Sequence, residues 1–160
     1  MNEPNHPQIS QAELAIIDSR IATLQAEDAV ATNELAEATH SGSETWHDNA
    51  AFDAAKDKKN LAQISLGKLM TLKRNATVID PAATPDRVSI GSCIRYHDED
   101  SGQEHEICLA GDGAWLMDEK WASVYAPVGQ LLHGAKVGET RTGRAGVREV
   151  SLTILEIKSL

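Results

Sequence analysis

Aromatic side chains and cysteines are scarce in this sequence. Phe, Trp and Tyr together make up 4% of the 160 residues, so a hydrophobic core must consist mainly of Leu, Ile, Val and Ala. The two cysteines, Cys93 and Cys108, are too few for the disulfide framework of a small secreted domain. In a reducing compartment we expect them to be free thiols within a sheet, although strand pairing could bring them together.

Long apolar runs are also missing. No stretch approaches the roughly 18 apolar residues that a membrane-spanning helix needs. The first ten residues, MNEPNHPQIS, lack the basic-then-apolar pattern of a secretory signal. We therefore expect a cytoplasmic protein with no membrane partner.

An excess of basic charge is absent as well. The formal net charge of −9 argues against nonspecific binding to a nucleic-acid duplex, which needs a basic surface. The charges are unevenly distributed, because residues 13–48 contain a single basic residue, Arg20, whereas lysine and arginine predominate in residues 53–74. An acidic segment followed by a basic one is typical of two paired antiparallel helices.

The first long helix is expected from residue 13 to residue 40. Ser10 and Glu13 have the spacing of a capping box, and no Pro or Gly interrupts the segment. Apolar residues follow at alternating spacings of three and four, which is the seam of a coiled coil, although Asp28 occupies one seam position. These residues are Leu14, Ile17, Ile21, Leu24, Ala31, Leu35 and Ala38. A rod roughly 40 Å long needs a partner helix.

The partner helix is expected at about residues 48–77. Its apolar stripe contains Phe52, Ala55, Ala62, Leu66 and Leu69. Gly67 weakens this helix by up to about 1 kcal/mol relative to alanine. Prolines at positions 81 and 85 end the element. The sequence thus predicts a helical hairpin over residues 1–80, with its tip near residues 41–49, and a linker at residues 81–86.

From residue 87 to residue 160 the pattern changes to short alternating segments rich in β-branched residues, separated by Gly, Asp and Ser. Residues 147–157 are the clearest strand, and residues 127–133 fit one or two helical turns closed by Gly134. We expect a compact, mostly antiparallel sheet with one short helix. The predicted fold class is therefore α+β.

Two segments resemble the GreA/GreB family of bacterial transcription elongation factors. The first contains Asp48-Asn49-Ala50-Ala51-Phe52 and later the helix exit Val78-Ile79-Asp80. The second is residues 123–139, SVYAPVGQLLHGAKVGE, which is similar to a signature of the family's C-terminal domain. The two matches occur in the family's order and together cover most of the chain.

This resemblance implies an FKBP-like C-terminal domain that docks on bacterial RNA polymerase, with Ser123, Pro127 and Gly134 as candidate contacts. The hairpin would enter the polymerase secondary channel and reach the 3′ end of the nascent RNA. There the tip acids would help the polymerase to hold a second Mg²⁺ and a water that cleaves backtracked RNA. The resemblance implies an accessory factor rather than an enzyme, monomeric and without a cofactor of its own.

The tip departs from the family pattern. Asp48 stands at the position of the family's second tip acid, and Thr45 stands by direct count at the position of the first. The tip is also two residues longer than in the family. Glu44 is therefore the candidate for the missing carboxylate. Two functions therefore stay open. One is stimulation of transcript cleavage, and the other is regulation or inhibition by a Gre-type fold that binds the channel without cleavage.

Several residues near the tip have two interpretations. Asp48 is either a metal-holding acid or the N-cap of the second helix, and Glu44 is either its partner or a solvated loop acid. Trp46 stacks on a base or folds between the helices, whereas His47 and Asn49 are candidate tip contacts. The basic residues beyond the tip either steer RNA or pair with the acidic first helix. These are Lys56, Lys58 and Lys59.

An independent enzyme is a weaker hypothesis. The histidines and cysteines do not have zinc-site spacings, and no nucleophile motif such as Gly-x-Ser-x-Gly occurs. A peptidyl-prolyl isomerase is conceivable only by analogy with the FKBP fold, and a fold does not carry an activity.

Overall fold

The computed structural model describes residues 6–41, 50–81 and 85–159. Contacts divide the chain into two compact units, of which one is Ile17–Arg74 and the other combines the residues up to Ile16 with those from Asn75 onward. The expected domain limits at residues 80 and 87 stay a prediction, because contacts alone do not define which parts fold independently. In the described part of the chain, no helix is both long and apolar enough to cross a membrane.

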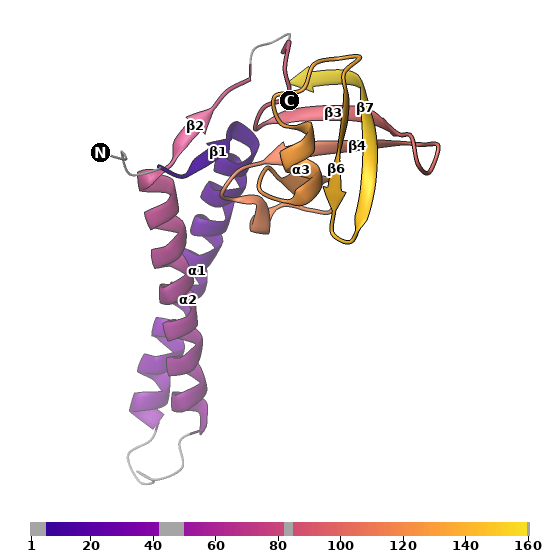
Figure 1. The fold of residues 1–160 in the computed structure, drawn as a ribbon. Helices are drawn as coiled ribbons and strands as arrows, with labels where there is room; N and C mark the ends of the chain where they lie inside the picture. The colour runs from indigo at the N-terminus through magenta and orange to yellow at the C-terminus, as the bar shows by residue number, and fades with distance from the viewer. Residues whose placement is uncertain (1–5, 42–49, 82–84, 160) are drawn as a thin grey trace, which may run out of the picture. The chain divides into compact units, whose positions relative to one another are not determined.

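Two long helices account for the hairpin, α1 (Gln11–Ser41) and α2 (Ala50–Asn75) (Figure 1). Asp18 pairs with Lys73 at 2.6 Å, and Glu34 pairs with Lys58 at 3.2 Å. An early residue of α1 thus pairs with a late residue of α2, and a late residue of α1 pairs with an early residue of α2. The two helices are therefore antiparallel, as expected.

One heptad row of each helix forms the buried seam. The buried residues recur every seven positions, at Ile17, Leu24, Ala31 and Ala38 in α1 and at Ala55, Ala62 and Leu69 in α2. A second row is only half-buried and includes two charged residues, Asp28 and Lys59. Because heptad spacing keeps a row on the partner-facing side, the sequence pattern predicted this seam correctly.

The second unit contains a five-stranded sheet with the strand order β5-β4-β3-β7-β6 (Figure 1). Its strands are β3 (Ser92–Asp98), β4 (Gln103–Ala110), β5 (Trp121–Ser123), β6 (Thr140–Ala145) and β7 (Arg148–Ser159). All neighbours are antiparallel except β4 and β5, which are parallel. The predicted α+β fold class is confirmed, and the described residues of this unit include one short α-helix, α3 (Pro127–Leu132).

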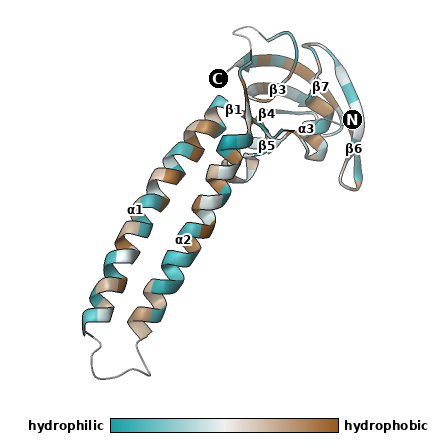
Figure 2. Cartoon of the chain, turned by 90° about the vertical axis from the view of Figure 1, so that its left-hand side faces the viewer, coloured by the Kyte–Doolittle hydropathy of each residue, from teal (hydrophilic) through white to brown (hydrophobic). Residues whose placement is uncertain are grey.

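The core of this unit contains aliphatic side chains from the sheet, from α3 and from the segment before β3. Ile94, Leu109, Leu132 and Ile154 are all fully buried. Figure 2 shows hydrophobic residues in brown at intervals along the strands of the sheet, between polar residues in teal. As expected from the scarcity of aromatic residues, this core consists mainly of Leu, Ile, Val and Ala, and Tyr96 is its aromatic member.

A small parallel pair of strands, β1 (Gln8–Ser10) and β2 (Thr77–Ile79), was not expected. The sequence pattern predicted helix up to residue 77, whereas α2 ends at Asn75. Parallel strands are not connected by a tight turn, so the sequence between them contains no turn motif that would predict their pairing. Ile9 in β1 is completely buried, which shows that this pair belongs to a packed region.

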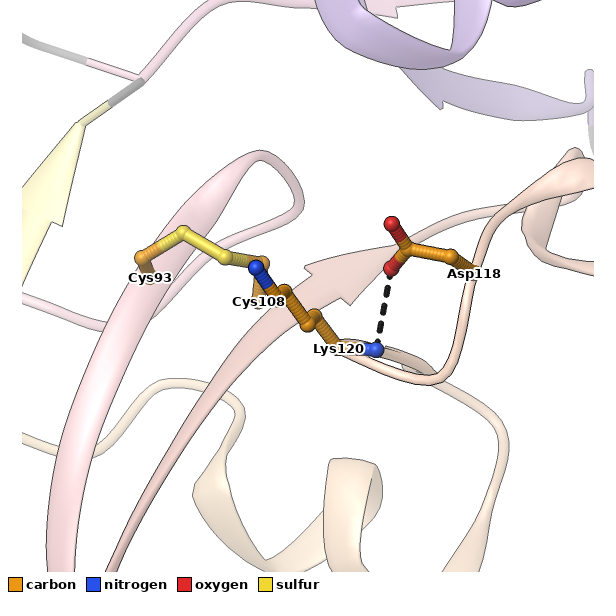
Figure 3. Close-up of a disulfide and its surroundings, with 4 residues drawn as sticks. All are labelled: Cys93, Cys108, Asp118 and Lys120. Carbon is orange, nitrogen blue, oxygen red and sulfur yellow. Dashed lines mark hydrogen bonds between the residues drawn. A yellow bond between two sulfur atoms is a disulfide. The ribbon is translucent and has the colours of Figure 1, made fainter.

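Cys93 and Cys108 form a disulfide between β3 and β4 (Figure 3). They are directly opposite in the antiparallel register, with their Cα atoms 3.9 Å apart. The expectation of free thiols is therefore wrong. It was inferred from the usual redox state of a compartment, whereas the pairing register decides which side chains are neighbours.

Candidate functional site

The hairpin tip is the first candidate site. The residues proposed there are Glu44, Trp46, His47, Asp48 and Asn49, and all of them lie outside the described residues. Helix α2 begins at Ala50, so the possible capping role of Asp48 also falls outside them. Their roles stay predictions.

The described stem next to the tip contains a cavity of about 380 Å³ between the end of α1 and the start of α2. Four alanines and two glutamates line it: Glu34, Glu37, Ala38, Ala51, Ala54 and Ala55. The alanine methyl groups are too short to fill the space between two helices, which accounts for the cavity. The stem is thus lined by small side chains close to the tip.

The three lysines beyond the tip have different environments. Lys58 pairs with Glu34 across the hairpin at 3.2 Å, so the interhelical interpretation holds for this residue. Both side chains are about half exposed, and a pair of this kind contributes little to stability. Lys56 is exposed and Lys59 is half-buried in the second heptad row. A role of these lysines in steering RNA stays a prediction.

The second candidate site is the segment from Ser123 to Glu139. Ser123 ends β5, and its hydroxyl oxygen accepts a hydrogen bond from the backbone N–H of Tyr125 at 3.2 Å. Pro127 is exposed and is the first residue of α3, where the missing N–H of proline needs no partner. Ser123 and Pro127 therefore lie on either side of one short turn.

Gly134 lies at the other end of α3 and has a backbone role of its own. Its φ of +78° is in the left-handed region that favours glycine. Its N–H donates to the Val88 carbonyl at 2.8 Å, and its carbonyl accepts from the Arg87 guanidinium at 2.9 Å. These bonds explain the glycine by local geometry, and whether Gly134 also contacts a partner stays a prediction.

Two further residues fix the conformation of this segment. A Cβ atom at Gly129 would overlap the backbone oxygen of Ser123, so only glycine lets α3 approach the end of β5 so closely. The Glu139 carboxylate accepts a hydrogen bond from the Lys136 N–H at 2.9 Å. This bond, followed by the one from Arg141, lowers the pKa of Glu139 and favours its ionised form.

Tyr125 and Asp112 form a contact that the sequence did not predict. The Tyr125 hydroxyl donates to the Asp112 carboxylate at 3.2 Å, and the Gln8 N–H donates to the same oxygen at 2.6 Å. Partial burial, and then the negative charge of Asp112, raise the pKa of Tyr125, so the phenol stays protonated and remains a donor. Asp112 thereby joins β1 to the turn that precedes α3.

The buried carboxylate of Glu13 is the other feature that the sequence analysis missed. Ser10 and Glu13 form the predicted capping box. The same carboxylate also accepts hydrogen bonds from the backbone N–H groups of Gly111 and Gly113, at 3.0 and 2.8 Å. The Gly-Asp-Gly motif directly after a predicted strand was the available signal, because paired glycines let a backbone approach closely.

Metal binding by the described residues has no structural support. Among residues 6–41, 50–81 and 85–159, no three His, Cys, Asp or Glu side chains are grouped so that they could hold an ion. Any contribution to Mg²⁺ binding would fall to Glu44 and Asp48, outside these ranges.

Comparisons with known proteins support the resemblance of the segment from Ser123 to Glu139 to the family signature. Residues 83–159 match the family model described as transcription elongation factor, GreA/GreB, C-terminal. Transcription elongation factor GreA of Caldanaerobacter subterraneus subsp. tengcongensis is 34% identical over 113 residues, which are 69% of this chain and 71% of that protein. The GreA of Thermoanaerobacter pseudethanolicus is 32% identical over the same shares of both chains. Among solved structures, GreA factor homolog 1 of Thermus thermophilus is 18% identical, with 97% of this chain and 100% of that chain covered and a TM-score of 0.45.

Proposed function

The chain belongs to the GreA/GreB family of transcription elongation factors, and from this membership we propose that it binds bacterial RNA polymerase and stimulates cleavage of backtracked RNA. In this proposal the C-terminal unit docks at the rim of the secondary channel and the hairpin enters the channel. The observation that carries the proposal is the 34% identity to a GreA over 113 residues, together with the family match over residues 83–159.

The dimensions of the hairpin support insertion into a channel. Helices of 31 and 26 residues are about 46 and 39 Å long at 1.5 Å per residue. The buried seam changes from Ile and Leu to alanine toward the tip, at Ala31, Ala38, Ala55 and Ala62. Short seam side chains add little bulk to the half of the hairpin nearer the tip, which suits entry into a channel.

The chemistry would be shared with the polymerase. A polymerase-bound Mg²⁺ would supply an activated water for hydrolysis. The part of this chain would be to bring the carboxylates of Glu44 and Asp48 to the 3′ end of the nascent RNA. On this proposal the protein is a monomeric, cytoplasmic accessory factor without a cofactor of its own.

A second candidate function is binding to RNA polymerase without stimulation of RNA cleavage. It is favoured by one observation, namely that Thr45 stands where the family's first tip acid is expected, in a tip two residues longer. A carboxylate displaced by the extra residues would not reach the metal. The protein would then occupy the channel and slow nucleotide addition.

The deciding experiment measures RNA shortening in purified, stalled, backtracked elongation complexes. Wild type is compared with Glu44→Ala and Asp48→Ala, and Asp57→Ala, which removes an exposed acid of α2, is the matched control. Shortening that depends on either tip acid, but not on Asp57, supports the cleavage factor. Binding without shortening, with slower nucleotide addition, supports the regulator, and absence of binding contradicts both.

A further inference from the structure

Two of the few aromatic side chains in this protein are strongly exposed. The chain has three Trp, two Tyr and one Phe. Trp115 is 65% exposed and Tyr125 is 52% exposed. Exposed Trp and Tyr side chains are typical of the energetically dominant residues of protein interfaces.

Both residues lie at the same end of the sheet. Strands β4 and β5 are the parallel pair, so their carboxyl ends point the same way. Trp115 follows the end of β4, in the single 3₁₀ turn η1 (Ala114–Leu116), and Tyr125 follows the end of β5. The hydrogen bond from Tyr125 to Asp112 joins the two loops directly.

Asp112 is hydrogen-bonded to Tyr125, and Asp118 and Glu119 are in the same loop as Trp115, next to the exposed Lys120. Asp112 lies between β4 and η1, and Asp118 and Glu119 are exposed just after η1. The Asp118 carboxylate accepts a hydrogen bond from the backbone N–H of Lys120 at 2.9 Å, which fixes its position in the turn (Figure 3). A surface that combines exposed rings with carboxylates fits a partner that is both apolar and basic.

We propose that Trp115 and Tyr125 are the aromatic anchors with which this protein docks on a basic, partly apolar surface of RNA polymerase. This inference rests on the proposed function and adds the residues that bind and the charge of the surface that they bind. The aromatic pair is continuous with the candidate docking segment, because Tyr125 lies between Ser123 and the exposed Pro127. A second copy of this chain is disfavoured as the occupant, because a symmetric contact would bring the same carboxylates together.

The test is competition for core RNA polymerase between fluorescently labelled wild type and unlabelled variants of the full chain. Trp115→Ala and Tyr125→Ala are each expected to weaken binding at least about tenfold. Val147→Ala is the matched control, because Val147 is an apolar side chain that is 94% exposed on the β6–β7 turn, and its binding should equal that of wild type. Tyr125→Phe retains the ring and should bind within about threefold of wild type, since the hydrogen bond to the half-buried Asp112 lies at the protein surface and contributes little.

Charge reversal gives an independent readout. Glu119→Lys is expected to weaken binding several-fold at low salt and to reduce the dependence of binding on salt concentration. Its side chain is exposed, so the variant should fold normally, as circular dichroism would verify. If Trp115→Ala and Glu119→Lys both compete as well as wild type, the inference is overturned and polymerase binding still stands. If wild type itself does not bind, the proposed function and the inference fall together.

Discussion

The Glu13 carboxylate accepts a hydrogen bond from the backbone N–H of Gly113, 100 residues later in the chain, at 2.8 Å. The same carboxylate accepts from Gly111 and from both the N–H and the hydroxyl of Ser10. Glu13 is completely buried, and these four donors satisfy its two carboxylate oxygens. The bonds to Gly111 and Gly113 connect the first turn of α1 to the loop after β4.

Removal of the Glu13 carboxylate should therefore destabilise the protein strongly. Glu13→Ala leaves buried donors without an acceptor and is expected to lower the free energy of unfolding by about 3 kcal/mol. Glu13→Gln retains one acceptor oxygen and should have a smaller effect. Urea unfolding followed by tryptophan fluorescence measures both, with the exposed Glu149→Ala as a control expected within about 0.5 kcal/mol of wild type. A Glu13→Ala variant as stable as this control would contradict the role of the carboxylate.

Two glycine substitutions should have opposite effects. A Cβ atom at Gly111 would overlap the backbone oxygen of Gln8, whereas a Cβ atom at Gly67 in α2 meets nothing within 4 Å. Gly111→Ala is thus expected to destabilise the protein by about 1–3 kcal/mol, and Gly67→Ala to stabilise it by up to about 1 kcal/mol. Thermal unfolding of the two variants beside wild type distinguishes them. Equal shifts in the same direction would show that close packing at Gly111 is unimportant.

Asp28 should limit the stability of the hairpin. One of its carboxylate oxygens is buried and has no hydrogen-bond partner in the described part of the chain, and the residue occupies a seam position. Asp28→Leu is expected to stabilise the hairpin by about 1–2 kcal/mol, because it removes an unpaired polar group and adds apolar contact. The contrasting variant is Leu24→Ala, one turn earlier in the seam, which should lose about 2–5 kcal/mol. Denaturation by urea measures both changes, and a loss of stability in Asp28→Leu would refute the expectation.

The Cys93–Cys108 disulfide should stabilise the sheet. Its sequence separation of 15 corresponds to a loop whose closure contributes about 3 kcal/mol. Reduction, or Cys93→Ser combined with Cys108→Ser, should lower the free energy of unfolding by a similar amount. Alkylation under native and reducing conditions, followed by mass spectrometry, reports whether the bond is present in the purified protein. Two alkylated thiols without reductant would argue against it.

The sequence was sufficient for the features that depend on local periodicity and charge. Heptad spacing from Ile17 to Ala38 predicted the buried seam, and the Ser10–Glu13 spacing predicted the capping box. Alternation after residue 87 predicted the sheet with one short helix. Each of these signals arises within a few residues, because helical and strand periods determine which side chains share a face.

Only the tertiary structure decided which distant groups meet. The β1–β2 pair, the Cys93–Cys108 bond and the shared end of β4 and β5 all depend on strand register, to which no local spacing corresponds. For the same reason the capping residue Glu13 also accepts hydrogen bonds from two glycine N–H groups, 98 and 100 residues away in the chain. The sequence by itself determined the two long helices and the strand-rich character of the region after residue 87. The fold determined that the loops of Trp115 and Tyr125 follow the ends of neighbouring strands, because parallel strands bring their carboxyl ends to the same edge of a sheet.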